Sequence, residues 1–188
     1  AQALKPGTVD DAMGMANKLA AAQVLLRDGE KLAKKGRFKA AVARYFTAKA
    51  IDPEIEVDPT AKAAEHALPV MLGHADRIAQ SNDRASAMRM YREILSIDPD
   101  QSIDPQVRAA QQAALGYRRE GEKAAINAKI DSAIESFRHA LELDPDLDIE
   151  PQGLAYRLAA PRLATNALKE VHKGKVEQGM QKLQLAIS

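Results

Sequence analysis

Small and apolar residues recur along the chain at spacings of three and four, which is the pattern of amphipathic α-helices. Ala41, Tyr45 and Ala48 follow this spacing, as do Phe137 and Ala140. Alanine is frequent and β-branched residues form no long runs, a composition that favours helices over strands. The pattern predicts a chain that is helical almost throughout.

The same pattern returns with a period of 46 residues. A unit of this size cannot bury its apolar face alone, so units of this kind stack on one another. The repetition is plainest at the prolines that follow an acidic residue, which are Pro53, Pro59, Pro99, Pro105, Pro145 and Pro151. We expect a single domain of four units, over residues 8–53, 54–99, 100–145 and 146–188.

Each unit is expected to hold a longer helix followed by a shorter one. The longer helices begin at an acidic residue and a proline, because a carboxylate accepts the unpaired amides of the first turn and proline lacks only an N–H that this turn does not use. Such caps are expected at Asp58, Asp104 and Glu150, and Thr8 with Asp11 is expected to cap the first long helix. The shorter helices should end at the Asp-Pro pairs, since the residue before proline avoids the helical region.

Tight turns between the two helices of each unit should make them antiparallel neighbours. Small residues or residues that tolerate positive φ are expected at these turns. The expected positions are Gly36, Asn82, Ala128 and Gly174. Pro69 and Pro161 stand inside longer helices, so a kink or break is predicted at both.

The two ends of the chain resemble cut points in a repeat. The segment from Ala1 to Pro6 matches the helix end from Ala140 to Pro145 in its Ala, Leu and Pro, and Ser188 falls one residue before a further Leu-Asp-Pro junction would begin. We expect a piece of a longer array or of a multidomain protein. The alternative is a mature chain from which a signal peptide was removed before Ala1.

Charge and composition exclude several classes of function. The 27 lysines and arginines nearly balance 26 acidic residues, so no global charge favours nucleic acid or an anionic membrane. Cysteine is absent, which removes disulfides and thiolate chemistry but leaves the compartment open. We expect a cytoplasmic protein, with a periplasmic or secreted one as the alternative. The longest apolar run, Leu19 to Leu26 with Gln23 inside it, is too short to cross a membrane.

The pattern of small, aromatic and proline positions resembles the tetratricopeptide repeat. The matching residues are Gly29, Gly36, Ala41, Tyr45, Ala48 and Pro53 in the first unit; Ala75, Ala87, Tyr91 and Pro99 in the second; Gly121, Ala133, Phe137, Ala140 and Pro145 in the third; and Ala167, Gly174, Gly179, Leu183 and Ala186 in a degenerate fourth. The resemblance implies a right-handed all-α solenoid of four antiparallel helix-turn-helix repeats. It also implies a protein or peptide interaction scaffold with no catalytic activity and no cofactor.

Two departures from the family qualify what the resemblance implies. Each unit is about twelve residues longer than the family's 34-residue unit, and the excess lies between its two prolines and in the opening of the longer helix. The family's two-carboxylate clamp requires Lys and Asn on the first helix, where this chain has Leu26 and Glu30. That mode of binding is not expected here.

The resemblance places the first helix of each repeat on the concave face, where Glu30, Asp76 and Glu122 would form an acidic column that ends at Leu168. A basic column runs beside it. The functional interpretation is a stripe that orients a basic peptide or helix; the alternative is solvated charge pairs that fix the register between repeats. The candidate contacts for a partner are Glu30, Leu72, Asp76, Arg118, Arg119 and Glu122, although Leu72 also fits a core position.

Other functions remain open at this stage. A passive spacer or self-assembly segment is the first alternative, because Leu183, Leu185 and Ile187 of the last helix lack a polar cap and should leave apolar surface exposed. An RNA-binding solenoid is the second alternative, although the only basic patch in this sequence is small. His66 and His74 share no ligand spacing typical of metal sites, and no phosphate-binding loop or nucleophile motif is present, so neither a metal nor an enzyme is expected.

Overall fold

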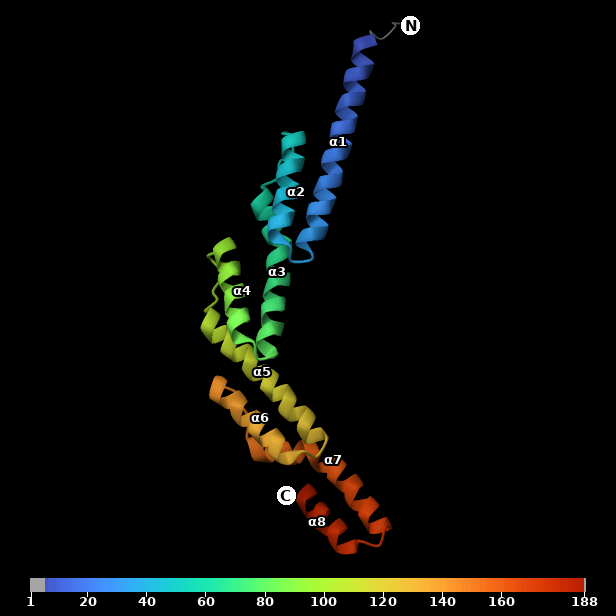
Figure 1. Ribbon diagram of the computed structural model, residues 1–188, viewed down its shortest axis with the longest axis vertical. Coiled ribbons are helices and arrows are strands. Elements are labelled where there is room, and N and C mark those ends of the chain that lie inside the picture. Colours follow the sequence, from blue (N-terminus) through green and yellow to red (C-terminus); the bar gives the residue numbers. More distant parts are fainter. Residues whose placement is uncertain (1–5, 188) are drawn as a thin grey trace. The chain divides into compact units, whose positions relative to one another are not determined.

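The computed structural model describes residues 6–187, and every regular element within them is an α-helix (Figure 1). The helices are α1 (Pro6–Ala33), α2 (Phe38–Ile51), α3 (Pro59–Gln80), α4 (Arg84–Ile97), α5 (Pro105–Ile126), α6 (Ile130–Leu143), α7 (Pro151–His172) and α8 (Val176–Ile187). Long and short helices alternate, and from α3 onward the long ones begin at the same 46-residue spacing as the sequence pattern. The expected all-α helical repeat is confirmed.

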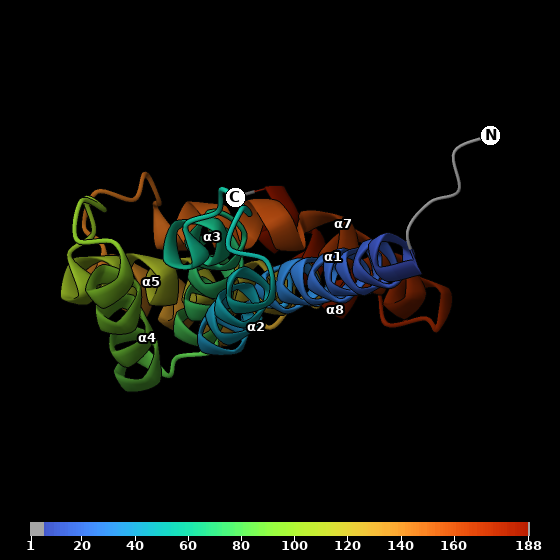
Figure 2. The same cartoon turned by 90° about the horizontal axis from the view of Figure 1, so that it is seen from above.

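The chain forms two compact units. The first contains the residues up to His74 together with Met90–Ser102, and the second contains Ala75–Arg89 together with the residues from Ile103 onward. In the first unit α2 lies beside α1, as Figures 1 and 2 both show. In the second unit α5 pairs with α6, α7 pairs with α8, and α7 also packs on α5 and α6.

Side-chain caps fix the starts of three long helices. The Oδ1 atom of Asp58 accepts hydrogen bonds from the amides of Thr60 and Ala61 at 2.8 and 3.0 Å. Asp104 and Glu150 accept the two equivalent amides at the starts of α5 and α7. Each cap is followed by proline in the first helical position, as predicted.

The cap expected for the first long helix was wrong. The helix α1 begins at Pro6, so Thr8 and Asp11 lie inside it and not at its start. Proline suits the first helical position because its missing N–H has no partner there in any case. The segment Ala1–Pro6 was expected to resemble the end of an earlier helix. All of this segment except Pro6 lies outside the described residues.

The turns within the repeats adopt the backbone that the sequence predicts. Gly36 and Gly174 have φ of 72° and 80°, while Asn82 and Ala128 have φ of 67° and 58°. A positive φ lets the chain leave the helix and reverse within a few residues. The shorter helices α2, α4 and α6 end directly before Asp-Pro, which was also predicted.

The two described helices that contain an internal proline do not break at it. The helices α3 and α7 continue as α-helix through Pro69 and Pro161, and both prolines are exposed. Next to Pro69, the side chains of Ala67 and Met71 are buried on the packed face. Burial of this face offsets the loss of one backbone hydrogen bond, so, of the predicted kink or break, the break does not occur.

The core of each unit contains an aromatic ring packed on a glycine. In the first unit the ring of Tyr45 lies so close to Gly29 that an added Cβ would meet it at 2.8 Å. In the second unit the ring of Phe137 lies in the same way on Gly121, at 2.6 Å. Phe137 belongs to an apolar cluster with Ala125, Ala133 and Ala155, which Ile130, Ile134, Leu154 and Leu158 partly cover.

Candidate functional site

Two of the candidate contact residues, Glu30 and Leu72, lie in the first unit. The carboxylate of Glu30 accepts a hydrogen bond from Lys34 Nζ at 2.6 Å, one turn further along α1. This bond is the main reason why the pKa of the Glu30 carboxyl lies below its ordinary value. Leu72 is partly buried on α3. Glu30 is thus a carboxylate whose only described ion-pair partner comes from its own helix.

Asp76 has a different role, because it joins two helices of the second unit. Arg108 donates from Nε and Nη2 to the two carboxylate oxygens of Asp76, both at 2.9 Å. The side chain of Asp76 is 20% exposed and that of Arg108 is 33% exposed. Such bidentate, charge-assisted pairs are stronger than single surface contacts. Asp76 therefore holds α5 against the end of α3.

The remaining candidates, Arg118, Arg119 and Glu122, lie on α5. Arg118 Nε donates to Glu122 Oε1 at 2.9 Å, so the structure brings these two together. Arg119 donates to Gln80 Oε1 at 2.6 Å, and Gln80 also donates to Gln112 at 2.6 Å. Arg119 thereby belongs to a polar seam between α3 and α5, which the sequence did not reveal.

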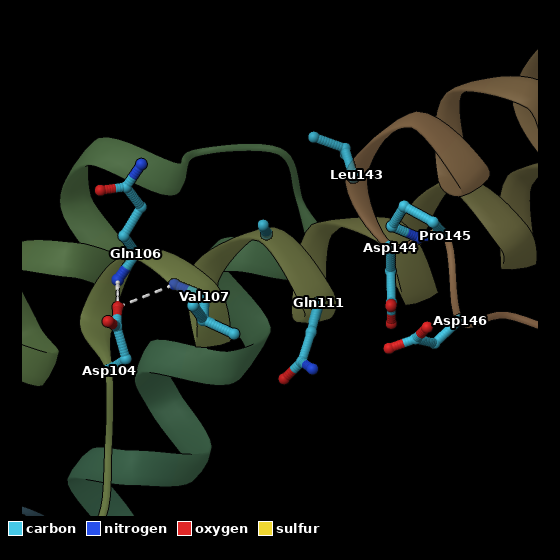
Figure 3. Close-up of a pocket in the computed structure, with 9 residues that line it drawn as sticks. Asp104, Gln106, Val107, Gln111, Leu143, Asp144, Pro145 and Asp146 are labelled. Atoms are coloured by element: carbon cyan, nitrogen blue, oxygen red, sulfur yellow. Dashed lines mark hydrogen bonds between the residues drawn. The ribbon is translucent and has the colours of Figure 1, made fainter.

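A hollow opens at the other end of α5, where this helix starts beside the end of α6 (Figure 3). It has a volume of about 440 Å³. Figure 3 shows Asp104 and Gln106 at one side, Val107 and Gln111 in the middle, and the turn after α6 at the other side. The hollow is lined by Asp104, Gln106, Val107, Ala110, Gln111, Leu143, Asp144, Pro145 and Asp146.

The hollow combines apolar surface with unpaired carboxylates. Val107 is 52% exposed. Asp104 is committed to the cap of α5, whereas Asp144 and Asp146 make no ion pair with any described residue. From the sequence, Asp144 was expected only to belong to an Asp-Pro pair that ends a helix, and Val107 was not singled out, because the segments that form the hollow are far apart along the chain.

The first unit contains a hollow at the equivalent repeat positions. It has a volume of about 330 Å³ and lies between the start of α1 and the turn after α2. Its lining residues are Met15, Lys18, Leu19, Ile51, Asp52, Pro53 and Glu54. Each of them stands two repeats before a lining residue of the hollow in Figure 3, so both hollows follow from the repeat.

Comparison with known protein families gives a match over residues 126–147, to the family described as tetratricopeptide repeat. The matched segment contains the turn at Ala128, all of α6 with Phe137, and the turn that lines the hollow. Over this segment the chain resembles a tetratricopeptide repeat. No curated protein and no solved structure matches the chain.

An apolar face of α8 is exposed in the part of the chain that the structure describes. Val176, Met180 and Leu183 are 52%, 60% and 38% exposed. In the preceding repeat the equivalent residues are Ile130, Ile134 and Phe137, which pack in the cluster with α7. The expected exposed apolar end is thus present at Leu183, while the side chains of Leu185 and Ile187 lie outside the described residues.

The described part of the chain contains no group of three or more His, Cys, Asp or Glu side chains that could hold a metal ion. His66 lies beside Glu65, with Nε2 4.0 Å from the carboxylate, and His139 contacts Glu142. None of the helices described over residues 6–187 has the length and apolar character needed to span a bilayer.

The match over residues 126–147 bears on function, because tetratricopeptide repeats typically serve as non-catalytic interaction scaffolds.

Proposed function

We propose that the chain is an interaction scaffold that binds a protein or peptide through the face of its long helices, at Glu30, Leu72, Asp76, Arg118, Arg119 and Glu122. The observation that supports this most is how Glu30 and Glu122 are paired. Each has a partner one turn away on its own helix, and all four side chains are more than a third exposed. Exposed pairs of this kind contribute little to stability, so a partner's charges can replace them at low cost.

Asp76 and Arg119 contribute to this face in another way. Their hydrogen bonds to Arg108 and Gln80 hold the end of α3 against α5 within the second unit. A partner that contacts both of these segments needs this arrangement, because its loss would spread the binding energy over many arrangements. We therefore assign Asp76 a positioning role and keep it out of the test variants.

The test compares capture of partners from a cell lysate by three proteins of equal helicity. The face variant carries Glu30→Lys and Glu122→Lys. The control carries Glu120→Lys and Glu135→Lys, which change the net charge equally at exposed positions outside the candidate set. We expect at least one protein to be captured by the original chain and the control but lost, at least tenfold, from the face variant. Equal loss from both variants would show that net charge, and not this face, governs capture.

Self-assembly is the second candidate function, and the exposed face of α8 favours it. An apolar face that is covered in one repeat and open in the next is a ready contact for another chain. Sedimentation velocity over a hundredfold range of concentration tests this. We expect the sedimentation coefficient to rise with concentration and Met180→Lys to prevent the rise. A coefficient that stays constant for the original chain would remove this candidate.

A further inference from the structure

We propose that the hollow between α5 and the turn after α6 is a second binding site, which takes a lysine or arginine side chain of a partner peptide together with a neighbouring apolar residue. It goes beyond the scaffold face proposed above, because it uses different residues. Either proposal can therefore fail while the other holds.

The apolar lining matches the stem of such a side chain. Val107, Ala110, Leu143 and Pro145 supply it, and Val107 is half exposed. Lysine and arginine cover apolar surface with their methylene groups while the charged head stays with polar partners. The volume of about 440 Å³ leaves room for one long side chain and part of its neighbour.

The charges at one rim favour a cation. Asp144 and Asp146 supply two carboxylates without a described ion pair, and none of the residues that line the hollow is lysine, arginine or histidine. The helix α6 ends at Leu143, so the negative end of its dipole lies at the same rim. The positive end of α5 lies at the opposite rim, where Asp104 already caps it.

The equivalent hollow of the first unit contains a lysine of the chain itself. Lys18 lines that hollow together with Asp52 and Glu54. In the second unit the residue at the position of Lys18 is Ala110, and the matching acids are Asp144 and Asp146. A lysine thus lines one hollow together with its acids, whereas the lining of the other hollow has acids and no cation.

These hollows also arise where this chain departs from the ordinary repeat. They are lined by the opening of a long helix and by the residues on either side of the first proline of a junction. The opening of the long helix is one of the segments that make each unit longer than the 34-residue unit of the family. A site built from them is therefore separate from the face of the long helices.

The test uses a fluorescein-labelled hexapeptide of alternating leucine and lysine, with blocked ends, and fluorescence anisotropy at about 50 mM salt. Asp146→Asn removes one carboxylate with little change of shape, and Ala110→Lys supplies the hollow with a cation of its own. We expect each to weaken binding about tenfold, as loss of a charge-assisted contact does. The matched controls Glu135→Gln and Ala85→Lys, at exposed positions, should bind as the original chain does.

The site is located by ¹H–¹⁵N spectra recorded during the titration. We expect the largest shifts at the amides of Val107, Gln111 and Asp146, and no binding of a leucine–glutamate peptide. Binding that is unchanged by both Asp146→Asn and Ala110→Lys would overturn the proposal. So would binding lost from the variant with Glu30→Lys and Glu122→Lys and retained by Asp146→Asn, because the peptide would then occupy the face of the long helices.

Discussion

The two compact units use the same contact with one difference of chemistry. In the first, Tyr45 packs on Gly29; in the second, Phe137 packs on Gly121. Both rings are buried, at 2% and 0% exposure. The hydroxyl of Tyr45, however, has no hydrogen-bond partner among the described residues. The fit of ring on glycine is thus common to both units, whereas the polar atom is an addition that the first unit must accommodate.

The surroundings of Tyr45 show what that addition costs. Burial is the main reason why the pKa of the Tyr45 hydroxyl is raised, and the nearby negative charge of Glu30 raises it further. A buried hydroxyl without a partner loses its hydration and gains no bond in exchange. We infer that steric fit selects the aromatic ring at this repeat position and that its polarity is secondary.

Removal of the second ring should have the largest effect. Phe137→Ala would leave a cavity in the cluster with Ala125, Ala133 and Ala155, and we expect the free energy of unfolding to fall by about 3–5 kcal/mol. Urea denaturation followed by circular dichroism measures this. Phe137→Leu is the control, and it should cost clearly less because it refills part of the space. Equal losses would show that the ring does not carry the packing.

Crowding of the ring should have the next largest effect. Gly121→Ala places a methyl group 2.6 Å from the ring of Phe137, and Gly29→Ala places one 2.8 Å from that of Tyr45. We expect each to lower the free energy of unfolding by about 1–3 kcal/mol, with the larger loss at Gly121 because its contact is closer. The control Gly14→Ala meets nothing within 4 Å and should not destabilise the protein. A larger loss of stability for Gly29→Ala than for Gly121→Ala would show that the distance to the ring does not determine the loss.

The substitution Tyr45→Phe should have the opposite effect and raise the free energy of unfolding. It removes the unpartnered hydroxyl and keeps the ring on Gly29, so we expect an increase of about 1 kcal/mol. The reciprocal Phe137→Tyr should lose stability, since it buries a hydroxyl among apolar side chains. Thermal unfolding of both variants checks this. A loss on Tyr45→Phe would reveal a bond that the hydroxyl makes in solution.

The smallest expected effect concerns pH at the start of α3. The amides of Ala61 and Thr60 lower the pKa of the Asp58 carboxyl. A folded-state pKa below the unfolded value means that the stabilisation is present above the ordinary value of about 3.9 and is lost as pH falls through the folded pKa.

We therefore expect Asp58→Asn to lose less stability than the original chain between pH 6 and pH 3. Urea midpoints at several pH values measure the difference. The lowered pKa values of Glu30, Glu65 and Asp83 act in the same direction in both proteins, so only the difference reports on Asp58. Parallel curves would show that the cap does not couple to folding.

Local signals predicted most of the fold. Asp-Pro pairs, small turn residues and the spacing of Tyr45 and Phe137 act over a few residues, and the sequence shows them directly. The predicted break at Pro161 failed because it depends on how strongly the packed face of α7 holds the helix together. There Ala159 and Leu163 are buried on either side of the proline.

The candidate site was less accessible to prediction, because its partners come from different helices. The sequence placed Asp76 in an exposed acidic column, but Arg108, which binds it, is contributed by the next long helix. The hollow at Val107 and Asp146 likewise joins segments that no local pattern connects. A comparison of equivalent positions in the four repeats would have singled out the exchange of Lys18 for Ala110.

Gly116 limits how freely the repeats of this chain can be exchanged. A Cβ at this position of α5 would collide with the backbone carbonyl of Gln80, whereas the equivalent residues of the other units are Val24, Val70 and Arg162. Backbone cannot move aside as a flexible side chain can. If another unit were copied into the place of the third, its valine or arginine would meet this carbonyl. The third unit can therefore be replaced only by a unit that has glycine at this position, which restricts the order of the units along the chain.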